Sequence, residues 1–231
     1  MFSLINWSII RSELLNGRPV LVYDSSNRES ETDMVFYARN IDYRKIAFLR
    51  REAGGLICFV SGRLFREVLG LSFIKDMFVS NSFYRKLCEK NPKYGDPPAF
   101  NIWVNHVDTT TGITDNDRAL TIRRLYDVAE LVYRGNSNEA IELFTREFYI
   151  PGHVPVLTSR GLMNRRGHTE LVTVIAMLTD LTPAMVIAEM LSEGFSLSYE
   201  DARRYAYRNN FVFIDGVDVV DEAVKKGLIN D

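Results

Sequence analysis

Residues 20–33 read Val-Leu-Val-Tyr-Asp-Ser-Ser-Asn-Arg-Glu-Ser-Glu-Thr-Asp. Pro19 to Tyr23 is typical of a short apolar strand, and the next ten residues hold four carboxylates and one arginine. We do not expect a segment of this composition in an apolar core. A strand that ends in oxygen ligands and one fixed cation suits a hard divalent ion and a phosphorylated or polyhydroxylated substrate. A solvated acidic turn has the same composition, so both interpretations stay open here.

A second polar segment precedes a predicted helix. Residues 164–170 read Asn-Arg-Arg-Gly-His-Thr-Glu and lead into the apolar run 171–178. The glycine allows a tight turn at the helix start, where the first-turn amides and the helix dipole favour an anion. Arg165 and Arg166 offer bidentate donors to a phosphate, and His168 can reach a metal or a substrate oxygen. The alternative is a capped helix start beside a solvated basic loop.

The rest of the chain alternates between helix and strand patterns, which predicts an α/β fold with a sheet covered on both faces. No Gly-x-Gly-x-x-Gly fingerprint occurs, so we do not expect a Rossmann fold. Asparagine, glycine and three prolines within 91–98 predict a long loop over 75–98. The patterns predict helices over 2–15, 44–53, 61–69, from 114, 138–148, 168–179, 183–193, 199–208 and 217–226, and strands over 19–23, 34–38, 55–60, 100–107, 154–157 and 211–214.

Three of these helices have recognisable starts. Ser3 is the expected cap of the first helix, and Thr114 with Asp117 forms a capping-box variant. Thr182 and Pro183 are the expected cap and first residue of the helix over 183–193. Glu189 then falls in the middle of that helix, on an otherwise apolar face, where an acid is either paired near a pocket or extended to solvent.

Length and composition limit the kind of protein that this chain can be. A chain of 231 residues with 46% hydrophobic and 25% charged residues fits a single soluble α/β unit. The net charge of −2 and the absence of a basic stripe argue against a nucleic-acid binder, and no apolar run approaches a membrane span. Cys58 and Cys88 form no disulfide or metal pattern, which predicts a reducing, cytoplasmic compartment. Cys58 is interpreted either as a small buried hydrophobe or as an accessible thiol.

Six segments in a fixed order carry a resemblance to one family. They are 28–33 (Arg-Glu-Ser-Glu-Thr-Asp), 51–58 (Arg-Glu-Ala-Gly-Gly-Leu-Ile-Cys), 109–114 (Thr-Thr-Thr-Gly-Ile-Thr), 117–119 (Asp-Arg-Ala), 151–153 (Pro-Gly-His) and 165–170 (Arg-Arg-Gly-His-Thr-Glu). The order resembles 3,4-dihydroxy-2-butanone 4-phosphate synthase of riboflavin biosynthesis, over about residues 3–195 and in an archaeal-like form. Ser30 and Thr32 replace the asparagine and glycine of that family's Arg-Glu-Asn-Glu-Gly-Asp. The threonine block also follows Val107 and Asp108 directly, without a short insert.

The resemblance implies a three-layer α-β-α sandwich around a mixed sheet, in a single domain over residues 1–231. It places Glu29 and His168 as ligands of Mg²⁺ or Mn²⁺, with no organic cofactor. It assigns proton transfer to Asp33, His153 and Glu189. His106 matches no family site, so we interpret it as structural. Substrate contacts fall to Arg28, Glu29, Asp33, Thr111, Arg165, Arg166, Gly167, His168, Thr169 and Glu189, and Glu31, Cys58 and Asp108 are possible neighbours of the site.

The implied reaction converts D-ribulose 5-phosphate to L-3,4-dihydroxy-2-butanone 4-phosphate and formate through an enediolate. A metal-dependent sugar-phosphate phosphohydrolase could use the same ligands, and a non-catalytic sugar-phosphate sensor needs only the binding groups. The family also implies a homodimer with sites near the subunit boundary, and we expect His153 to reach the partner's site. Because the sequence ends at Asp231 without a second catalytic pattern, we expect a monofunctional enzyme.

Overall fold

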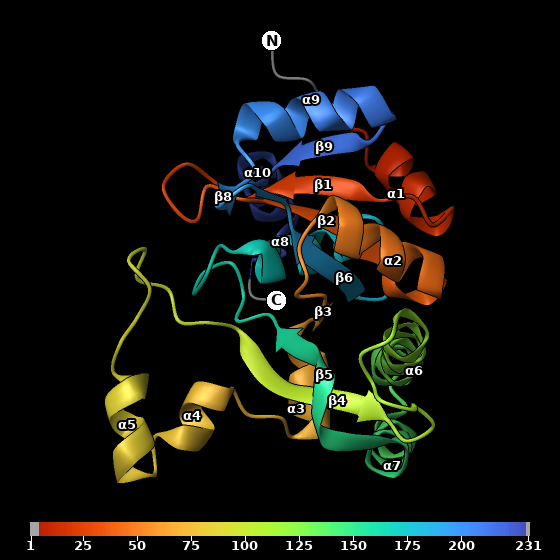
Figure 1. The fold of residues 1–231 in the computed structure, drawn as a ribbon, viewed down its shortest axis with the longest axis vertical. Helices are drawn as coiled ribbons and strands as arrows, with labels where there is room; N and C mark the ends of the chain where they lie inside the picture. The colour runs from red at the N-terminus through yellow and green to blue at the C-terminus, as the bar shows by residue number, and fades with distance from the viewer. Residues whose placement is uncertain (1–4, 230–231) are drawn as a thin grey trace.

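The structure is a computed structural model that describes residues 5–229. One seven-stranded sheet runs through it in the order β4-β5-β3-β6-β2-β1-β9 (Figure 1). The pairs β1–β9 and β3–β5 are parallel and the other pairs are antiparallel, so the sheet is mixed, as predicted. The strands are β1 (Val20–Tyr23), β2 (Thr32–Tyr37), β3 (Cys58–Ser61), β4 (Phe100–His106), β5 (Phe148–Thr158), β6 (Ala184–Glu189) and β9 (Val212–Asp215), with a separate hairpin of β7 (Leu191–Ser192) and β8 (Phe195–Ser196).

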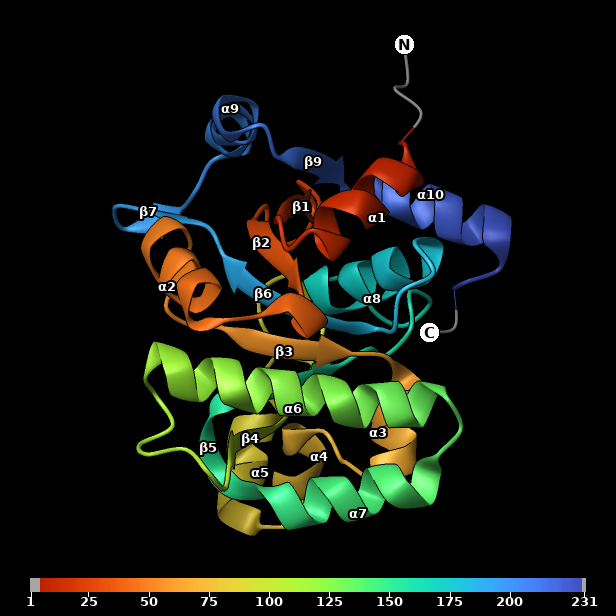
Figure 2. The ribbon, with the colours of Figure 1, turned by 90° about the vertical axis from the view of Figure 1, so that its right-hand side faces the viewer.

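Helices cover both faces of this sheet, which confirms the predicted three layers (Figure 2). On one face α8 packs against β1, β3 and β6, and α10 packs against α8. On the other face lie α2 and α6, and α3 and α7 pack against α6. The helices are α1 (Trp7–Leu15), α2 (Tyr43–Glu52), α3 (Arg63–Leu69), α4 (Ile74–Phe78), α5 (Ser82–Cys88), α6 (Asp115–Tyr133), α7 (Ser137–Glu147), α8 (His168–Leu178), α9 (Tyr199–Asn209) and α10 (Gly216–Lys226), with a 3-10 turn at Ala38–Asn40.

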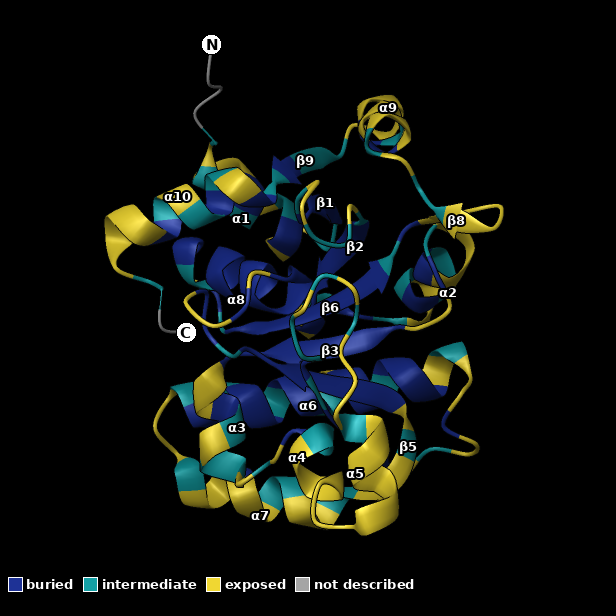
Figure 3. Ribbon diagram, turned by 90° about the vertical axis from the view of Figure 1, so that its left-hand side faces the viewer, coloured by how far each residue is buried: buried dark blue, intermediate teal, exposed yellow. Residues whose placement is uncertain are grey.

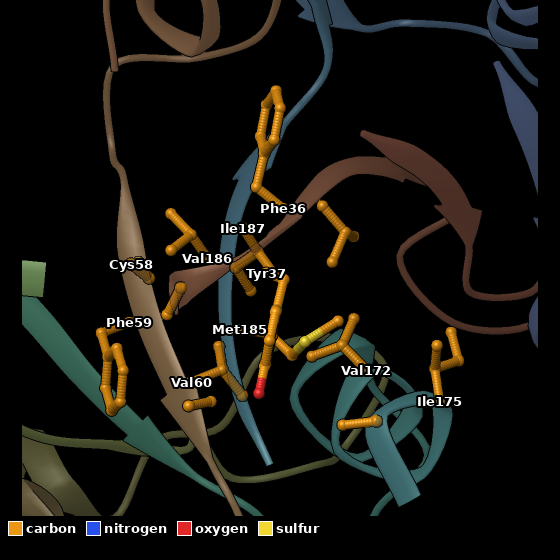
Figure 4. Close-up of a cluster of buried hydrophobic side chains, with 14 of the residues drawn as sticks. Phe36, Tyr37, Cys58, Phe59, Val60, Val172, Ile175, Met185, Val186 and Ile187 are labelled. Carbon is orange, nitrogen blue, oxygen red and sulfur yellow. The ribbon is translucent and has the colours of Figure 1, made fainter. Parts of the chain in front are cut away.

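The core lies between the central strands and α8. Every residue of β1, β2 and β3 is buried, and Figure 3 shows these strands as the buried centre of the molecule. Figure 4 shows Met185 and Ile187 of β6 packed with side chains of β2, β3 and α8. Strands covered on both faces have no polar side, which explains why they read as continuous apolar runs rather than as an alternating pattern.

The predicted helix over 183–193 is wrong. Residues Ala184–Glu189 form β6, which pairs with β2 on one side and β3 on the other. Short apolar runs do not distinguish a buried strand from a helix, and a strand in the middle of this sheet is apolar on both faces. Thr182 therefore caps no helix, and its hydroxyl hydrogen-bonds the Glu130 carboxylate at 2.5 Å. Glu189 ends a strand instead of lying mid-helix.

Residues 75–98 are not one loop, because α4 and α5 form within them and leave only 79–81 and the stretch from 89 onward irregular. The strand predicted over 154–157 is longer: β5 begins at Phe148, which the sequence had placed in the preceding helix.

Asn6 caps α1, and the predicted cap Ser3 lies outside the described residues. The predicted cap Thr114 is confirmed, since its side chain accepts the Asp117 N–H at 3.1 Å. No helix within 5–229 is long and apolar enough to cross a membrane.

Candidate active site

The acidic loop, residues 24–31, joins the antiparallel strands β1 and β2 (Figure 1). Asp24 organises it from within: its buried carboxylate accepts the N–H of Glu29 at 3.0 Å and of Glu31 at 3.1 Å. Ser30 has a φ of 56°, in the left-handed region where an asparagine, as in the family pattern, is better tolerated. The segment is therefore a loop, as predicted, but Asp24, Thr32 and Asp33 are buried, contrary to the expectation that it stays outside the core.

His168 is the first residue of α8 and lies buried against this loop. Its Nε2 atom is 3.2 Å from the main-chain oxygens of Val22 and of Glu31. Because carbonyl oxygens only accept hydrogen bonds, Nε2 carries a proton. Nδ1 then faces the carboxylates of Glu29, at 3.6 Å, and of Asp33, at 3.5 Å. A ring held in this way has one nitrogen committed to the protein and the other available to a ligand.

Asp24, Glu29 and His168 form a group, here called the metal cluster, whose ligand atoms all lie within 4.8 Å of one another. Two carboxylates and one imidazole match the donors that Mg²⁺ or Mn²⁺ accepts. The buried Oδ1 of Asp33, beside the same histidine, has no hydrogen-bond partner within residues 5–229. A buried oxygen without a partner is costly, and a cation or substrate hydroxyl would satisfy it. The residues present therefore fit a divalent metal.

Charges in the cluster are strongly coupled. Burial raises the pKa of Asp33 to about 8, with the carboxylates of Glu189 and Glu29 adding to the shift and His168 opposing it. Burial favours the neutral ring of His168, but the charge of Asp33 and a hydrogen bond with Glu29 raise its pKa to about 9. Burial likewise opposes ionisation of Glu29, yet hydrogen bonds from His168 and Tyr94 lower its pKa to about 2. Without metal, the His168 ring is thus cationic against the ionised carboxylate of Glu29.

Glu189 and Asp33 are directly paired across β6 and β2. Burial also raises the pKa of Glu189, so two carboxyl groups with raised pKa values stand side by side at the cluster. Groups tuned in this direction can accept and return protons near neutral pH. Cys58, on the next strand, is 2% exposed, and burial and the same two carboxylates raise the pKa of its thiol. The thiol is therefore buried near the site and protonated, which favours the interpretation as a small hydrophobe.

Two guanidinium groups converge beside the cluster, over the start of α8. A Cβ atom on Gly167 would lie 2.4 Å from an Arg165 nitrogen and 2.5 Å from an Arg28 nitrogen, so a side chain there would have to displace both guanidinium groups. Arg28 Nη2 and Arg165 Nε are buried and have no hydrogen-bond partner in the described part of the chain. We call Arg28, Arg165 and Gly167 the arginine cradle. Cationic donors at a helix N-terminus suit a phosphate.

A cavity of about 530 Å³ opens beside the cradle. Asp24, Arg28 and Arg165 lie on its wall, whereas Asp33 and Glu189 are not among its described lining residues. The exposed Arg166 also lines the cavity. Thr169 is buried and is the second residue of α8. The cavity therefore opens on the arginine cradle and does not include the carboxyls of Asp33 and Glu189 in its described lining.

Four residues that shape this site were not predicted from the sequence. Asp24 belongs to the quoted acidic segment but was not singled out. Tyr94 stacks 4.7 Å from the Arg28 guanidinium and hydrogen-bonds Glu29, and Asp96 pairs with Arg28 at 3.1 Å. In the sequence, only the length of the predicted loop over 75–98 indicated a functional role for Tyr94 and Asp96. Glu170 is fully buried, accepts the Gly167 N–H at 3.2 Å and pairs with Arg165 at 2.5 Å.

Other predicted residues lie apart from the cluster. Among the described residues, no hydrogen bond or ion pair joins Thr111, His153 or Asp108 to it. β6 and β3 lie between β5, which carries His153, and β2, which carries Asp33, so these two strands are about 14 Å apart across the sheet at about 4.8 Å per strand. In Figure 1 the end of β4, which pairs with this part of β5, lies on the opposite side from the acidic loop. We call Thr111 and His153 the distal group.

Two predicted neighbours have clear structural partners. Glu31 accepts a hydrogen bond from the Ser196 hydroxyl of β8 at 2.5 Å, which ties the acidic loop to the β7–β8 hairpin. Asp108 is exposed, and its main-chain N–H hydrogen-bonds His106 Nδ1 at 3.1 Å. His106 is buried and pairs with Glu147 at 3.2 Å, which agrees with its structural interpretation.

Known proteins share both the sequence and the fold. The chain is 40% identical over 214 residues to the 3,4-dihydroxy-2-butanone 4-phosphate synthase of Archaeoglobus fulgidus, with 89% of this chain and 88% of that protein covered. The enzyme of the same name from Methanosarcina acetivorans is 38% identical over 215 residues, with 89% and 85% covered. A crystal structure of a 3,4-dihydroxy-2-butanone 4-phosphate synthase with two magnesium ions superposes with a TM-score of 0.72 at 25% identity, covering 96% of this chain and 98% of that one.

The family model for 3,4-dihydroxy-2-butanone 4-phosphate synthase matches residues 9–222, which include the metal cluster, the arginine cradle and the distal group. The mixed sheet places the first two side by side through the β1–β2 pair and the start of α8. Sequence, fold and site thus agree, and the chain belongs to the 3,4-dihydroxy-2-butanone 4-phosphate synthase family.

Proposed function

We propose that this chain, a lyase of riboflavin biosynthesis by family, converts D-ribulose 5-phosphate to L-3,4-dihydroxy-2-butanone 4-phosphate and formate. One observation carries the proposal: the paired carboxyls of Asp33 and Glu189 lie beside the His168 ring and next to an arginine cradle. Proton transfer and phosphate binding are thereby combined in one site. The reaction loses one water and takes up one, so the atoms of the pentulose phosphate are divided between the two products.

The residues present define how the substrate would be handled. Arg28 and Arg165 hold the phosphate at the start of α8. Asp33 accepts the proton next to the ketone, since it is buried and its pKa is raised. Glu189, directly across the sheet, is placed to move a second proton. A Mg²⁺ or Mn²⁺ ion held by Glu29 and His168, with Asp24 adjacent, supplies Lewis-acid polarisation of the substrate oxygens. The solved relative with two magnesium ions supports this cofactor.

Formate is the product that separates this function from its alternatives. Incubation with ribulose 5-phosphate and Mg²⁺ should release formate and no inorganic phosphate. Phosphate without formate would identify the phosphohydrolase. Binding of ribulose 5-phosphate with neither product would identify a sensor. The buried, coupled carboxyls support an enzyme, because a sensor gains nothing from carboxyl groups with raised pKa values away from the phosphate.

Arg165→Ala is expected to raise KM and to lower stability. Loss of one charge-assisted phosphate contact costs about 1.5–3 kcal/mol, a ten- to hundredfold rise in KM with little change in kcat. The buried carboxylate of Glu170 also loses its cationic partner Arg165, which costs about 3–5 kcal/mol of unfolding free energy. Steady-state kinetics and urea unfolding measure the two effects.

Two further variants separate the effect on KM from the effect on stability. Arg165→Met with Glu170→Gln removes the unpaired charge and should recover most of the stability while KM stays high. Arg166→Ala, at the exposed neighbouring arginine, should leave unfolding unchanged. A wild-type KM in the double variant would remove Arg165 from the phosphate site.

A homodimer with shared sites is part of the proposal. His153 and Thr111 are both exposed, although the family pattern makes them site residues. Large apolar side chains within four residues of them in the sequence are also exposed: Val107, Ile113, Tyr149 and Ile150 are 50%, 51%, 43% and 61% exposed. Contiguous exposed apolar surface marks an interaction site. We infer that this surface packs on a second copy and carries the distal group into the partner's site.

Subunit complementation tests this arrangement. His153→Ala and Glu29→Gln should each be inactive alone. After subunit exchange, hybrid dimers should regain one working site of two, because one chain supplies intact Glu29 and the other intact His153. Native mass spectrometry confirms the exchange. Exchanged hybrids without formate release would show that each site is built within one chain.

Residues 1–231 are proposed to act as one catalytic domain. The free cysteines Cys58 and Cys88 agree with a reducing compartment, and a cytoplasmic location is proposed on that ground.

A further inference from the structure

Asn105 connects the two members of the distal group. It lies on β4, opposite the irregular start of β5, and is 1% exposed. Its Oδ1 atom accepts the main-chain N–H of His153 at 2.8 Å. Its Nδ2 atom is 3.1 Å from His153 Nδ1 and 3.0 Å from the Tyr149 hydroxyl. One buried amide therefore holds both the backbone and the ring of His153.

The main-chain contact determines how the amide is oriented. A backbone N–H is only a donor, so the amide oxygen must face it and the amide nitrogen must face the ring. Nδ2 is a donor, and His153 Nδ1 consequently accepts its hydrogen bond. The 3.4 Å approach of Oδ1 to the same ring nitrogen is longer and involves an oxygen already bonded to the backbone. A neutral His153 ring therefore carries its proton on Nε2, away from the protein.

The Asn105 amide also packs closely against Gly112, in the loop of residues 109–114 that carries Thr111. Gly112 has a φ of +89°, and a Cβ atom there would lie 2.1 Å from Asn105 Nδ2. The Asp117 carboxylate fixes this loop from the other side by accepting the N–H of Gly112 at 2.9 Å and of Thr111 at 3.1 Å. Asn105 thus sits between the loop of Thr111 and the ring of His153.

We propose that Asn105 is a positioning residue that sets the tautomer of His153 and presents Nε2–H to the substrate. Asparagine is suited to this role because it has one acceptor and one donor, for a backbone N–H and a ring nitrogen respectively. Aspartate has the same shape but only acceptors, so it would draw the proton to Nδ1 and leave Nε2 bare. The catalytic consequence rests on the proposed function, in which His153 transfers a proton, but the tautomer itself does not.

Histidine ¹⁵N NMR of the full chain tests the tautomer directly, with His153→Gln used for assignment. Wild type should show a protonated Nε2 and a bare Nδ1 at His153. Asn105→Asp should reverse this pattern and lower kcat by roughly 10²–10⁴, the usual range for a lost proton transfer, with little change in KM. Asn101→Asp is the matched control, because Asn101 is also buried on β4 but hydrogen-bonds Ser72 and Thr158. It should lower stability without changing the His153 tautomer or kcat.

The outcomes separate this inference from the proposed function. A wild-type His153 with its proton on Nδ1 would overturn the inference, even if Asn105→Asp does not fold. An unchanged tautomer in folded Asn105→Asp would overturn it as well, as would a reversed tautomer with wild-type kcat. Absence of formate release by wild type would instead contradict the proposed function, and the tautomer measurement would stand.

Discussion

Asp33→Asn is expected to lower kcat for formate release by roughly 10²–10⁴, with a small change in KM. The amide keeps the shape of the buried side chain at the start of β2 but cannot accept the proton next to the ketone. Glu31→Gln is the matched control in the same loop, since Glu31 is more exposed and hydrogen-bonds Ser196. It should keep most of the activity. Wild-type kcat in Asp33→Asn would remove Asp33 from the proton-transfer role.

The same substitution should stabilise the metal-free protein above pH 4. The pKa of Asp33 is raised from 3.8 to about 8 in the folded state, so the folded protein holds a proton that the unfolded chain releases. The contribution of the protonated Asp33 carboxyl to the stability of the folded protein is fully present below pH 3.8 and is lost as pH rises toward 8. Asparagine does not titrate. The gain in melting temperature should therefore be absent near pH 3.8, grow to about pH 8 and then level off.

Thermal unfolding in EDTA across this pH range measures the difference. Equal pH dependence of Asp33→Asn and wild type would show that Asp33 ionises normally. A loss of activity combined with a gain of stability is typical of a group whose buried position serves function rather than folding.

Removal of divalent metal is expected to abolish formate release, and added Mg²⁺ or Mn²⁺ should restore it. The metal cluster holds two carboxylates within 4.8 Å of each other and of an imidazole, an arrangement that favours a cation. The negative charge of an enediolate needs the same cation. EDTA treatment followed by metal titration, with formate as the readout, measures the effect. Full turnover in metal-free buffer would contradict the metal assignment.

Glu29→Gln tests whether the need for a divalent metal arises from the metal cluster. It should weaken Mg²⁺ binding in calorimetry and lower kcat together, because the amide is a weaker ligand than the carboxylate. Glu142→Gln, at an exposed carboxylate of α7, should change neither. Wild-type metal binding by Glu29→Gln would mean that the acidic loop is only a solvated turn.

Sequence by itself determined the chemistry that each segment can perform. Residues 24–33 and 164–170 are polar segments beside apolar runs, and their carboxylates, arginines and histidine are defined by composition alone. The order of motifs along the chain added the family and hence the roles predicted for Glu29, Asp33 and His168. Most helices were also readable, because a one-sided apolar stripe such as that of α2 and a cap such as Thr114 are local signals.

Only the tertiary structure decided which of these groups meet. β6 looked like a helix because a strand buried on both faces has no local period, and its pairing with β2 is what brings Glu189 opposite Asp33. The partners Tyr94, Asp96 and Glu170 are set by contacts between segments far apart in the chain or by burial that composition does not reveal. Likewise, the place of His153 three strands from Asp33 follows from strand order, which depends on long-range pairing and carries no local signal.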